Sequence, residues 1–444
     1  MKRETDMRES GAPAVLRVAT FLTAIAAIAA GALPAAAGIC PDAAAITGGF
    51  ELPMAAVRLL ADDALEGRLA GSAGERCAGD YIAATFRRLG LRPAGEADTY
   101  FQSLPLASIL NPHAAAGTGR NVVALLEGAD PGLRREVVVV GAHYDHLGHG
   151  APGSLAPDEP GVIHNGADDN ASGVGTMLRV AQRLASGPPT ARSVVFVAFT
   201  GEESGLLGSE YFAAHFTLPS DTMVAMINMD MVGRLGSGNL IINGVDTAEE
   251  WRSVVDAALA KAGVAASLSG EGYGPSDHTS FYTRDVPVLH LFTNVHGDYH
   301  RPSDDWQKID GAGMEKVASI VFDITTAVAN RRPSLTLMRG AGRPPAPAGE
   351  ASRGYGAYLG SVPDFTPVER GVKLSGVSPG SPADKAGIRG GDILVGLGQF
   401  EVADLQGMTD ALRAHKPGDE VEVRLLRDGR ALTLKVTLGT RRPG

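Results

Sequence analysis

The stretch REVVVVGAHYDHLG, residues 135–148, decides the fold of this chain. Its four consecutive valines are typical of a strand buried on both faces of a sheet, and such strands belong to parallel sheets covered by helices. A second stretch, SVVFVAFTGEES at residues 193–204, repeats the pattern of an apolar run that ends in polar, metal-binding side chains. The two stretches predict central strands with functional residues at their carboxyl ends.

The segments around these two alternate between strand and helix periodicity. The other expected strands are residues 121–128, 223–230 and 286–292, and the expected helices are residues 171–185, 206–216, 248–262 and 313–331. Residues 53–91 also carry apolar side chains at helical spacing. This alternation predicts an α/β fold with a mostly parallel central sheet flanked by helices.

The composition changes after the last of these helices. Residues 333–353 are rich in Pro, Gly and Ala and follow neither periodicity, which predicts a linker. Residues 354–441 hold short strand-like runs with Gly-rich turns, which predicts a small, mainly β domain. The larger domain is expected at residues 38–332, a division that suits a chain of 444 residues.

The start of the chain has the form of a processing signal. Basic residues up to Arg17 precede an apolar, Ala-rich run at 18–33, and Ala35-Ala36-Ala37 before Gly38 resembles a signal-peptidase site. The run is shorter than the roughly 20 residues of a spanning helix, which favours a cleaved signal at 1–37 over a membrane anchor. We expect an exported protein, periplasmic or secreted after cleavage near Ala37, with no membrane span in the mature chain.

The charge of the chain limits its possible partners, and its cysteines bear on the compartment in which it folds. The formal net charge is −10 and Lys and Arg form no cluster, which argues against a nucleic-acid partner. The two cysteines, Cys40 and Cys77, both fall early in the mature chain. In an oxidising compartment they could pair and tie the N-terminal segment to the domain, and the sequence leaves that pairing open.

Metal-binding side chains recur where strand-like runs give way to loops. They are His143, Asp169, Glu203, Asp230 and His300. In open α/β sheets the carboxyl ends of the strands face one crevice, so these side chains are expected to meet there. Histidine and carboxylate ligands without thiolates suit zinc best.

Two pairs of adjacent acids support a metal site. Asp168 and Asp169 precede a helix, where a cap explains one acid but two neighbouring buried carboxylates need a cation. Glu202 and Glu203 directly follow an apolar strand. Two metals can hold and activate a water between them, and a nearby carboxylate must then take its proton. The second pair therefore offers one ligand and one general base.

The motifs HYDH, GADDNASG, GEES, NMD and YHRPSDD, in this order and spacing, resemble the M28-type zinc aminopeptidases. These share their core fold with other co-catalytic zinc exopeptidases, and the resemblance runs over about residues 52–330. It implies that Asp169 bridges two zinc ions, that His143 and Asp230 complete one site, and that Glu203 and His300 complete the other.

The resemblance also implies roles around the metals. Glu202 would be the general base, Asp145 would support His143, and Tyr299 would donate to the developing oxyanion. A cis peptide would join Asp169 to Asn170. Asp277 and His278 of the SDHTSF motif would shape the pocket, and the remaining nearby histidines are interpreted as loop or rim residues: His146, His149, His164 and His296.

Residues 355–441 resemble a PDZ domain of the bacterial protease-associated kind, through AYLG, VSPGSPADKAGIRGGDILVGLG and LRAHKPGDEVEVRLLRDG. The resemblance implies that backbone amides of Tyr358, Leu359 and Gly360 bind the terminal carboxylate of a peptide. The alternative interpretation, that this domain only stabilises or oligomerises the protein, has nearly equal weight.

Three functions follow from these motifs. The first is an exported dizinc aminopeptidase that hydrolyses N-terminal residues from peptides with a free N-terminus. The second is a single-zinc acyltransferase of the glutaminyl cyclase kind, which has the same scaffold. The third is a PDZ-based peptide-binding protein with an inactive peptidase domain. The complete set of ligands together with Glu202 favours the first.

Overall fold

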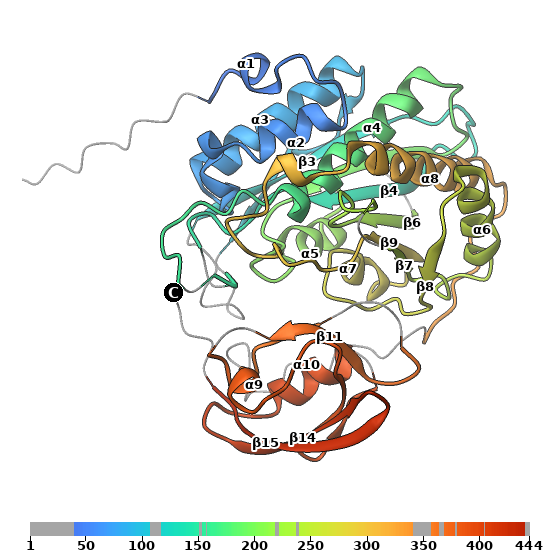
Figure 1. The fold of residues 1–444 in the computed structure, drawn as a ribbon. Helices are drawn as coiled ribbons and strands as arrows, with labels where there is room; N and C mark the ends of the chain where they lie inside the picture. The colour runs from blue at the N-terminus through green and yellow to red at the C-terminus, as the bar shows by residue number, and fades with distance from the viewer. Residues whose placement is uncertain are drawn as a thin grey trace, which may run out of the picture. The chain divides into compact units, whose positions relative to one another are not determined.

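The computed structural model describes residues 40–106, 117–150, 153–156, 158–217, 222–236, 239–340, 357–363, 368–377, 380–403 and 405–439. The expected signal at 1–37 and residues 341–353 of the expected linker lie outside them. The described residues form a larger α/β domain and a smaller β domain, each with its own hydrophobic core (Figure 1). None of the helices in these described ranges is both long and apolar enough to cross a bilayer.

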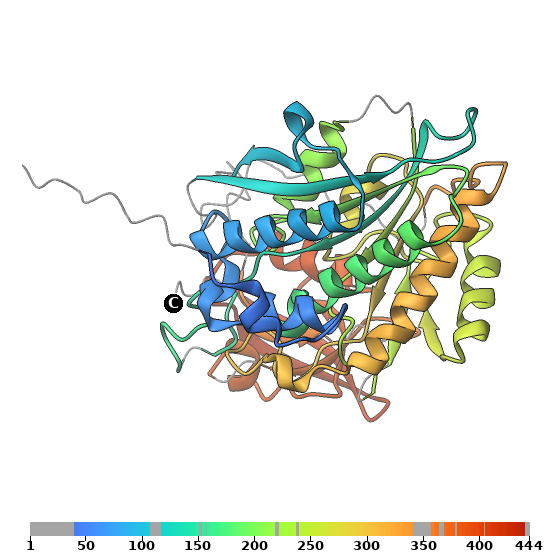
Figure 2. The same cartoon turned by 90° about the horizontal axis from the view of Figure 1, so that it is seen from above.

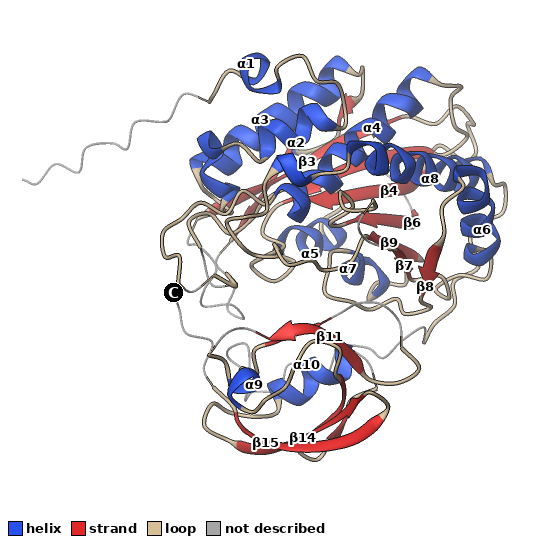
Figure 3. Cartoon of the chain, viewed as in Figure 1, coloured by secondary structure: helices blue, strands red, loops and turns tan. Residues whose placement is uncertain are grey.

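A nine-stranded sheet forms the centre of the larger domain (Figure 3). β4 (Glu136–His143) pairs in parallel with β5 (Ser193–Phe199) and β6 (Thr222–Met229), and β6 pairs in parallel with β9 (Val288–Phe292). The outer strands are β1 (Arg92–Pro93), β2 (Phe101–Pro105), β3 (Thr118–Leu126), β7 (Leu240–Asn243) and β8 (Ala266–Leu268). β3 joins β5 and β7 joins β9 in antiparallel pairings. The predicted α/β class is confirmed, and its parallel part is concentrated in the four central strands.

Helices cover both faces of this sheet. One face shares a core with α2 (Met54–Leu60), α3 (Ala73–Arg88), α4 (Gly173–Ser186), α6 (Trp251–Ala262) and α8 (Gly311–Asn330). Figure 2 shows α3, α4 and α8 running across the sheet in blue, green and orange. The other face is covered by α5 (Leu207–Ala214) and α7 (His278–Tyr282).

The valine run of β4 is buried on both faces, as its composition predicts. Val138 and Val140 belong to the core on the α4 side, whereas Val137 and Val139 belong to the core on the α5 side. Successive side chains of a strand point to opposite faces, so an uninterrupted apolar run is needed when helices cover both.

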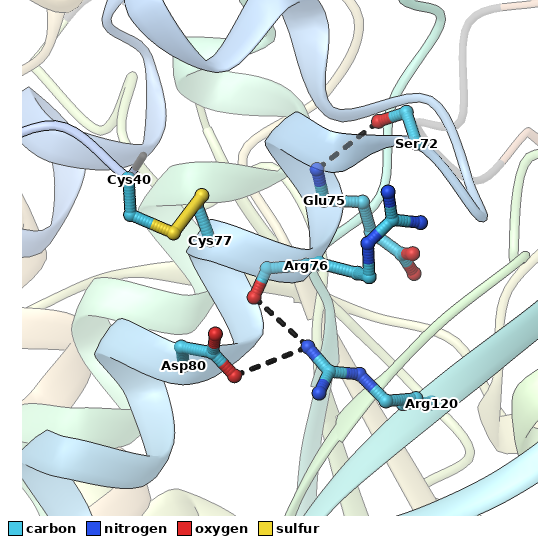
Figure 4. The surroundings of a disulfide bond; sticks show 7 residues. All are labelled: Cys40, Ser72, Glu75, Arg76, Cys77, Asp80 and Arg120. Atoms are coloured by element: carbon cyan, nitrogen blue, oxygen red, sulfur yellow. Dashed lines mark hydrogen bonds and ion pairs between the residues drawn. A yellow bond between two sulfur atoms is a disulfide. The ribbon is translucent and has the colours of Figure 1, made fainter. Parts of the chain in front are cut away.

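The N-terminal region is anchored by a disulfide. Cys40, just before α1 (Ala43–Thr47), is bonded to Cys77 of α3 (Figure 4). α3 begins after Ser72, whose hydroxyl accepts a hydrogen bond from the Glu75 amide at 3.1 Å. The pairing that the sequence left open is therefore present in the structure.

The first residues of the expected linker pack on the larger domain. Leu335 is buried, and Leu337 forms an antiparallel bridge with Ala248. The Met338 amide donates to the Thr247 carbonyl at 2.8 Å. The larger domain therefore extends at least to Met338.

The smaller domain is an antiparallel sheet with two short helices. Its strands are β10 (Ser361–Pro363), β11 (Val372–Val377), β12 (Ile393–Leu397), β13 (Phe400–Glu401), β14 (Glu420–Arg427) and β15 (Arg430–Thr437). Its helices are α9 (Pro382–Lys385) and α10 (Leu405–Arg413). A separate core that includes Leu374, Leu394 and Val423 holds them together.

Candidate metal centre

The carboxyl ends of the four central strands lie in register. His143 is the last residue of β4 and pairs with Phe199 at the end of β5, and Met229 at the end of β6 pairs with Leu291 of β9. The loops that leave these ends carry Glu202, Glu203, Asp230 and His300, and Asp169 lies in the irregular turn before α4. The five residues predicted as ligands are thereby brought to one edge of the sheet.

The spacing of the donor atoms fits two cations. His143 Nε2 lies 3.3 Å from Asp169 Oδ1 and 3.3 Å from Asp230 Oδ1. His300 Nε2 lies 3.2 Å from Asp169 Oδ2 and 3.3 Å from Glu203 Oε2. Ligands at the usual 2.0–2.1 Å around a tetrahedral zinc are about 3.3 Å apart. One ring N–H shared between two oxygens makes only long, weak hydrogen bonds, so a central ion accounts for the spacing around each histidine better.

Asp169 is held by its neighbour in the chain. The peptide bond from Asp169 to Asn170 is cis, as expected. Asn170 Oδ1 accepts hydrogen bonds from the amides of Gly173 and Met231, and Asn170 Nδ2 donates to the Met229 carbonyl. These bonds tie the Asp169 turn to the start of α4 and the end of β6, which fixes its carboxylate between the two histidines.

Asp168 points away from these donors. Its carboxylate accepts from the Gly233 amide at 2.6 Å and from His296 Nε2 at 3.0 Å. Asp304 supports the same turn, because its Oδ2 accepts from the amides of Asp168 and Asp169 at 2.8 and 3.1 Å. Its Oδ1 lies 3.0 Å from Arg234 Nη2. The carboxylates of Asp168 and Asp169 therefore lie in separate environments.

Glu202 lies beside the His143 donors. A carboxylate oxygen of Glu202 is within 4.8 Å of ligand atoms of both His143 and Asp230. The Glu202 amide donates to Asp145 Oδ1 at 3.1 Å, whereas His143 Nδ1 lies 3.3 Å from the Asp145 carbonyl and 3.8 Å from Asp145 Oδ1. The Asp145 residue thus contacts His143 through its backbone and the Glu202 loop through its carboxylate.

Carboxylates outnumber cationic groups in this centre. Burial, together with the charges of Glu203, Asp230 and Asp277, raises the pKa of Glu202 well above its usual value. Burial opposes protonation of His300, but Glu203 and Asp169 outweigh it and raise the His300 pKa to about 10. Against burial, His300 lowers the Glu203 pKa to about 2. An excess of buried negative charge with histidine nitrogens is the donor chemistry that divalent zinc requires.

Two polar residues that sequence reasoning missed contact the carboxylates of Asp230 and Glu203, the outer carboxylates of the centre. Ser276 Oγ donates to Asp230 Oδ2 at 2.8 Å and accepts from Asn228 Nδ2 at 2.8 Å. His146 Nδ1 lies 2.9 Å from Glu203 Oε1. His146 lies in the loop after β4 and is fully buried, so of the two predicted places, loop or rim, it has the first. The signal for it was the HYDH motif, in which both histidines follow one buried strand.

The other candidates lie around this centre. The Tyr299 ring stacks on His300 with centroids 3.9 Å apart, and burial raises the Tyr299 pKa well above its usual value, so the phenol keeps its proton. The His278 ring stacks on His290 at 4.6 Å, behind the Asp230 side of the site. His164 is buried, and its Nε2 lies 2.8 Å from Ser154 Oγ, whereas His149 is exposed.

Arg68 lies in the DDALEGR stretch at residues 62–68, within the part of the chain that carries the family resemblance. Its buried guanidinium donates to the carbonyls of Tyr144 at 2.8 Å, Asn165 at 2.6 Å and Gly166 at 3.0 Å. Burial lowers the Arg68 pKa to about 10, so the group is still a cation at neutral pH. Arg68 thus joins the His143 loop to the Asp169 turn.

In the smaller domain, the loop expected to bind a peptide carboxylate already makes hydrogen bonds within the domain. The Tyr358 amide donates to the Gly439 carbonyl at 2.9 Å, and the Leu359 carbonyl accepts from the Ala383 amide at 2.8 Å. Gly360 has φ +82, and a Cβ there would lie 2.2 Å from Ser381 Cβ, so this position requires glycine. Of the three amides, that of Tyr358 is already used.

Comparisons with known proteins agree with both domains. Residues 121–325 match the model of peptidase family M28, and residues 359–438 match that of a PDZ domain. A probable leucine aminopeptidase of Arthroderma otae is 32% identical over 213 residues, which cover 45% of this chain and 57% of that protein. The chain spans 54–57% of the length of three matching probable leucine aminopeptidases, little more than half.

Two solved structures show the fold. A Zn-dependent exopeptidase from Parabacteroides distasonis has a TM-score of 0.52 at 20% identity and covers 65% of this chain and 99% of its own. A glutaminyl cyclase from Bacteroides thetaiotaomicron has a TM-score of 0.51 at 17% identity and covers 62% and 96%. Because both activities occur on this fold, the site and not the fold must discriminate between them.

Proposed function

Residues 121–325 form a peptidase domain of family M28 and residues 359–438 a PDZ domain, and we propose that the chain is an exported dizinc aminopeptidase. It would release N-terminal residues from peptides with a free N-terminus. The chain would comprise a signal at 1–37, the peptidase domain at 38–332, a linker and the PDZ domain at 354–441.

The observation that best supports the proposal is that the two oxygens of the Asp169 carboxylate lie near two different histidines. Its Oδ1 lies 3.3 Å from His143 Nε2 and its Oδ2 lies 3.2 Å from His300 Nε2. A carboxylate with each oxygen at ligand spacing from a different histidine suits a bridge between two ions. His143, Asp169 and Asp230 would hold one zinc, and His300, Asp169 and Glu203 the other.

The remaining residues would move protons and orient the site. Two bound zinc ions would lower the pKa of a water and polarise the scissile carbonyl. Glu202 would take the proton of that water and pass it to the leaving amine. Asp145 would position Glu202 by accepting its amide hydrogen bond at 3.1 Å. Tyr299, which keeps its proton, would donate to the developing oxyanion.

The surroundings of the ligands favour a substrate with an apolar side chain. Met231, Ile241 and Phe292 form a small apolar cluster, with Val295 and Tyr299 partly exposed against it. Met231 directly follows Asp230, and Tyr299 directly precedes His300. We therefore expect N-terminal residues with apolar side chains as substrates.

Export and the PDZ domain complete the proposal. A disulfide between Cys40 and Cys77 suits an oxidising compartment such as the periplasm or the exterior, and agrees with the signal expected before it. The PDZ domain would bind peptide C-termini through the amides of Leu359 and Gly360, since that of Tyr358 donates to Gly439.

A zinc titration tests the proposal. Metal-free protein is titrated against leucyl, alanyl and glutamyl anilides, and activity should rise up to two zinc ions per chain with leucyl substrate hydrolysed fastest. Glu202→Gln should keep both ions and lose about 10²–10⁴ in kcat. Glu210→Gln, which changes an exposed glutamate of α5, serves as the matched control and should be unaffected.

Other outcomes would select other functions. Saturation at one zinc, with release of ammonia from an N-terminal glutaminyl peptide, would support the cyclase reaction that the structural likeness makes an alternative. Two bound ions without hydrolysis of any anilide would leave peptide capture by the PDZ domain. Near-normal turnover of Glu202→Gln would refute its role as base.

A further inference from the structure

We propose that His146 is a positioning residue for Glu203, holding one oxygen of that carboxylate so that only the other reaches the metal. The inference rests on the proposed metal centre and assigns a role to the second histidine of the HYDH motif. It predicts that the Glu203 ion depends on His146 although His146 does not bind it.

The two Glu203 oxygens have different partners. Oε1 lies 2.9 Å from His146 Nδ1, which is a normal hydrogen-bond length, and Oε2 lies 3.3 Å from His300 Nε2, which is the spacing of two zinc ligands. A ligand role for His146 is the alternative, because ligand atoms of His146, Asp169 and Glu203 all lie within 4.8 Å of one another. Two ligands of one tetrahedral zinc, however, are expected about 3.3 Å apart. His146 Nδ1 instead lies 2.9 Å from Glu203 and 3.9 Å from Asp169 Oδ2.

The His146 ring is fixed by its surroundings. A Cβ at Gly166, which has φ +57, would lie 2.5 Å from His146 Cγ, so the ring packs directly on the Gly166 backbone. The His146 amide donates to the Arg68 carbonyl at 3.1 Å, and the His300 ring meets the His146 ring edge to face at 5.8 Å. The Gly166 backbone on one side and the His300 ring on the other thus hold the His146 ring beside Glu203.

The hydrogen bond defines the proton position on the ring. Ionised Glu203 only accepts, so Nδ1 carries the proton that it donates. His146 Nε2 is buried and has no hydrogen-bond partner among the residues that the structure describes. The Nδ1–H tautomer directs the ring's one donor at Glu203.

The other outer ligand is held in the same way. Ser276 Oγ donates to Asp230 Oδ2 at 2.8 Å, which leaves Oδ1 at 3.3 Å from His143 Nε2. Each of these two carboxylates therefore offers one oxygen toward its histidine, and a zinc ion bound there would keep a position for water or substrate, as catalytic zinc sites require. Partners of this kind change metal affinity about 10–100-fold when removed.

Two amide substitutions distinguish the role of the Nδ1 donor from that of the rest of the His146 ring. In His146→Asn the side-chain nitrogen occupies the place of Nδ1 and can reach Glu203, whereas in His146→Gln it occupies the place of Nε2 and cannot. We expect His146→Gln to weaken one of the two zinc sites about 10–100-fold in competition with a chelating dye. His146→Asn should bind both ions as the unsubstituted protein does, and its cobalt-substituted visible spectrum should also be unchanged.

Equal zinc affinity of His146→Gln and the unsubstituted protein would overturn the proposal, as would equal losses in both variants. If His146→Gln does not fold, nitrogen NMR of the zinc-loaded protein decides: a proton on His146 Nδ1 supports the positioning role, and a bare Nδ1 overturns it. Failure of the proposed function is a separate result, since two zinc ions bound without hydrolysis would leave the His146 comparison intact.

Discussion

Asp304→Asn should destabilise the larger domain even when no metal is bound. Asp304 is fully buried, and its carboxylate connects three groups. Its Oδ2 accepts from the amides of Asp168 and Asp169, and its Oδ1 is paired with Arg234 Nη2 at 3.0 Å. An asparagine whose oxygen keeps the two amides must turn its NH₂ group toward the guanidinium, which has only donors to offer.

The size of the effect follows from these contacts. Loss of the charged hydrogen bond to Arg234 costs about 1.5–3 kcal/mol, and the two amide bonds each weaken by about 1 kcal/mol when their acceptor becomes neutral. Burial and the charge of Asp168 raise the pKa of Asp304, which shows that the buried charge is itself unfavourable and offsets part of this. We expect a net loss of about 2 kcal/mol of unfolding free energy.

Urea unfolding at pH 7 with a chelator measures this loss. The two tryptophans of the chain, Trp251 and Trp306, both lie in the larger domain, so their fluorescence reports that domain alone. Asp305→Asn is the matched control, because Asp305 is partly exposed and accepts one bond from Asn165 at 3.2 Å. Its cost should stay within about 0.5 kcal/mol. Equal costs for the two variants would refute the role given to Asp304.

Two further predictions concern stability. Reducing the Cys40–Cys77 bond, whose partners are 37 residues apart, should lower the unfolding free energy of the larger domain by at most about 4 kcal/mol, measured by urea titration with and without reductant. Hydrogen bonds from Arg427 lower the pKa of Asp392, so they stabilise the smaller domain above pH 4 and lose that effect on acidification. Arg427→Met should therefore accelerate amide exchange in β14 at pH 7 and change it little near pH 2; equal acceleration at both would contradict the assignment.

The sequence predicts the central part of the fold because burial imposes a pattern on it. Between two helical layers, β4 has an uninterrupted non-polar run from Val137 to Ala142 and β5 one from Val194 to Phe199, and both runs end near the crevice. Some of the predicted ligands are recognisable for the same reason, since His143 ends β4 and Asp230 directly follows β6, whereas Asp169 and His300 lie farther from a strand. The strands β1, β2, β7 and β8 were missed, because each has only two to five residues, too few for a recognisable periodicity.

The residues that sequence reasoning missed act through contacts between distant segments. Ser276 reaches Asp230 across 46 positions and Arg68 reaches Gly166 across 98. No periodicity or charge pattern marks a serine or an arginine for such a contact, because the partner is brought close only by the folded sheet. Tyr358 illustrates the same limit, since its amide is used by Gly439 at the opposite end of the domain.

The geometry of two histidines separates the reactions that this fold supports. If the site held one ion, one histidine would be free to turn its N–H toward a single carboxylate at a normal hydrogen-bond length. His146 does this with Glu203 at 2.9 Å, but His143 and His300 each lie at 3.2–3.3 Å from two oxygens. The same loops thus contain a histidine that hydrogen bonds and two whose spacing fits coordination. This internal contrast supports the proposal of two ions, with hydrolysis assisted by Glu202, over a one-ion acyl transfer.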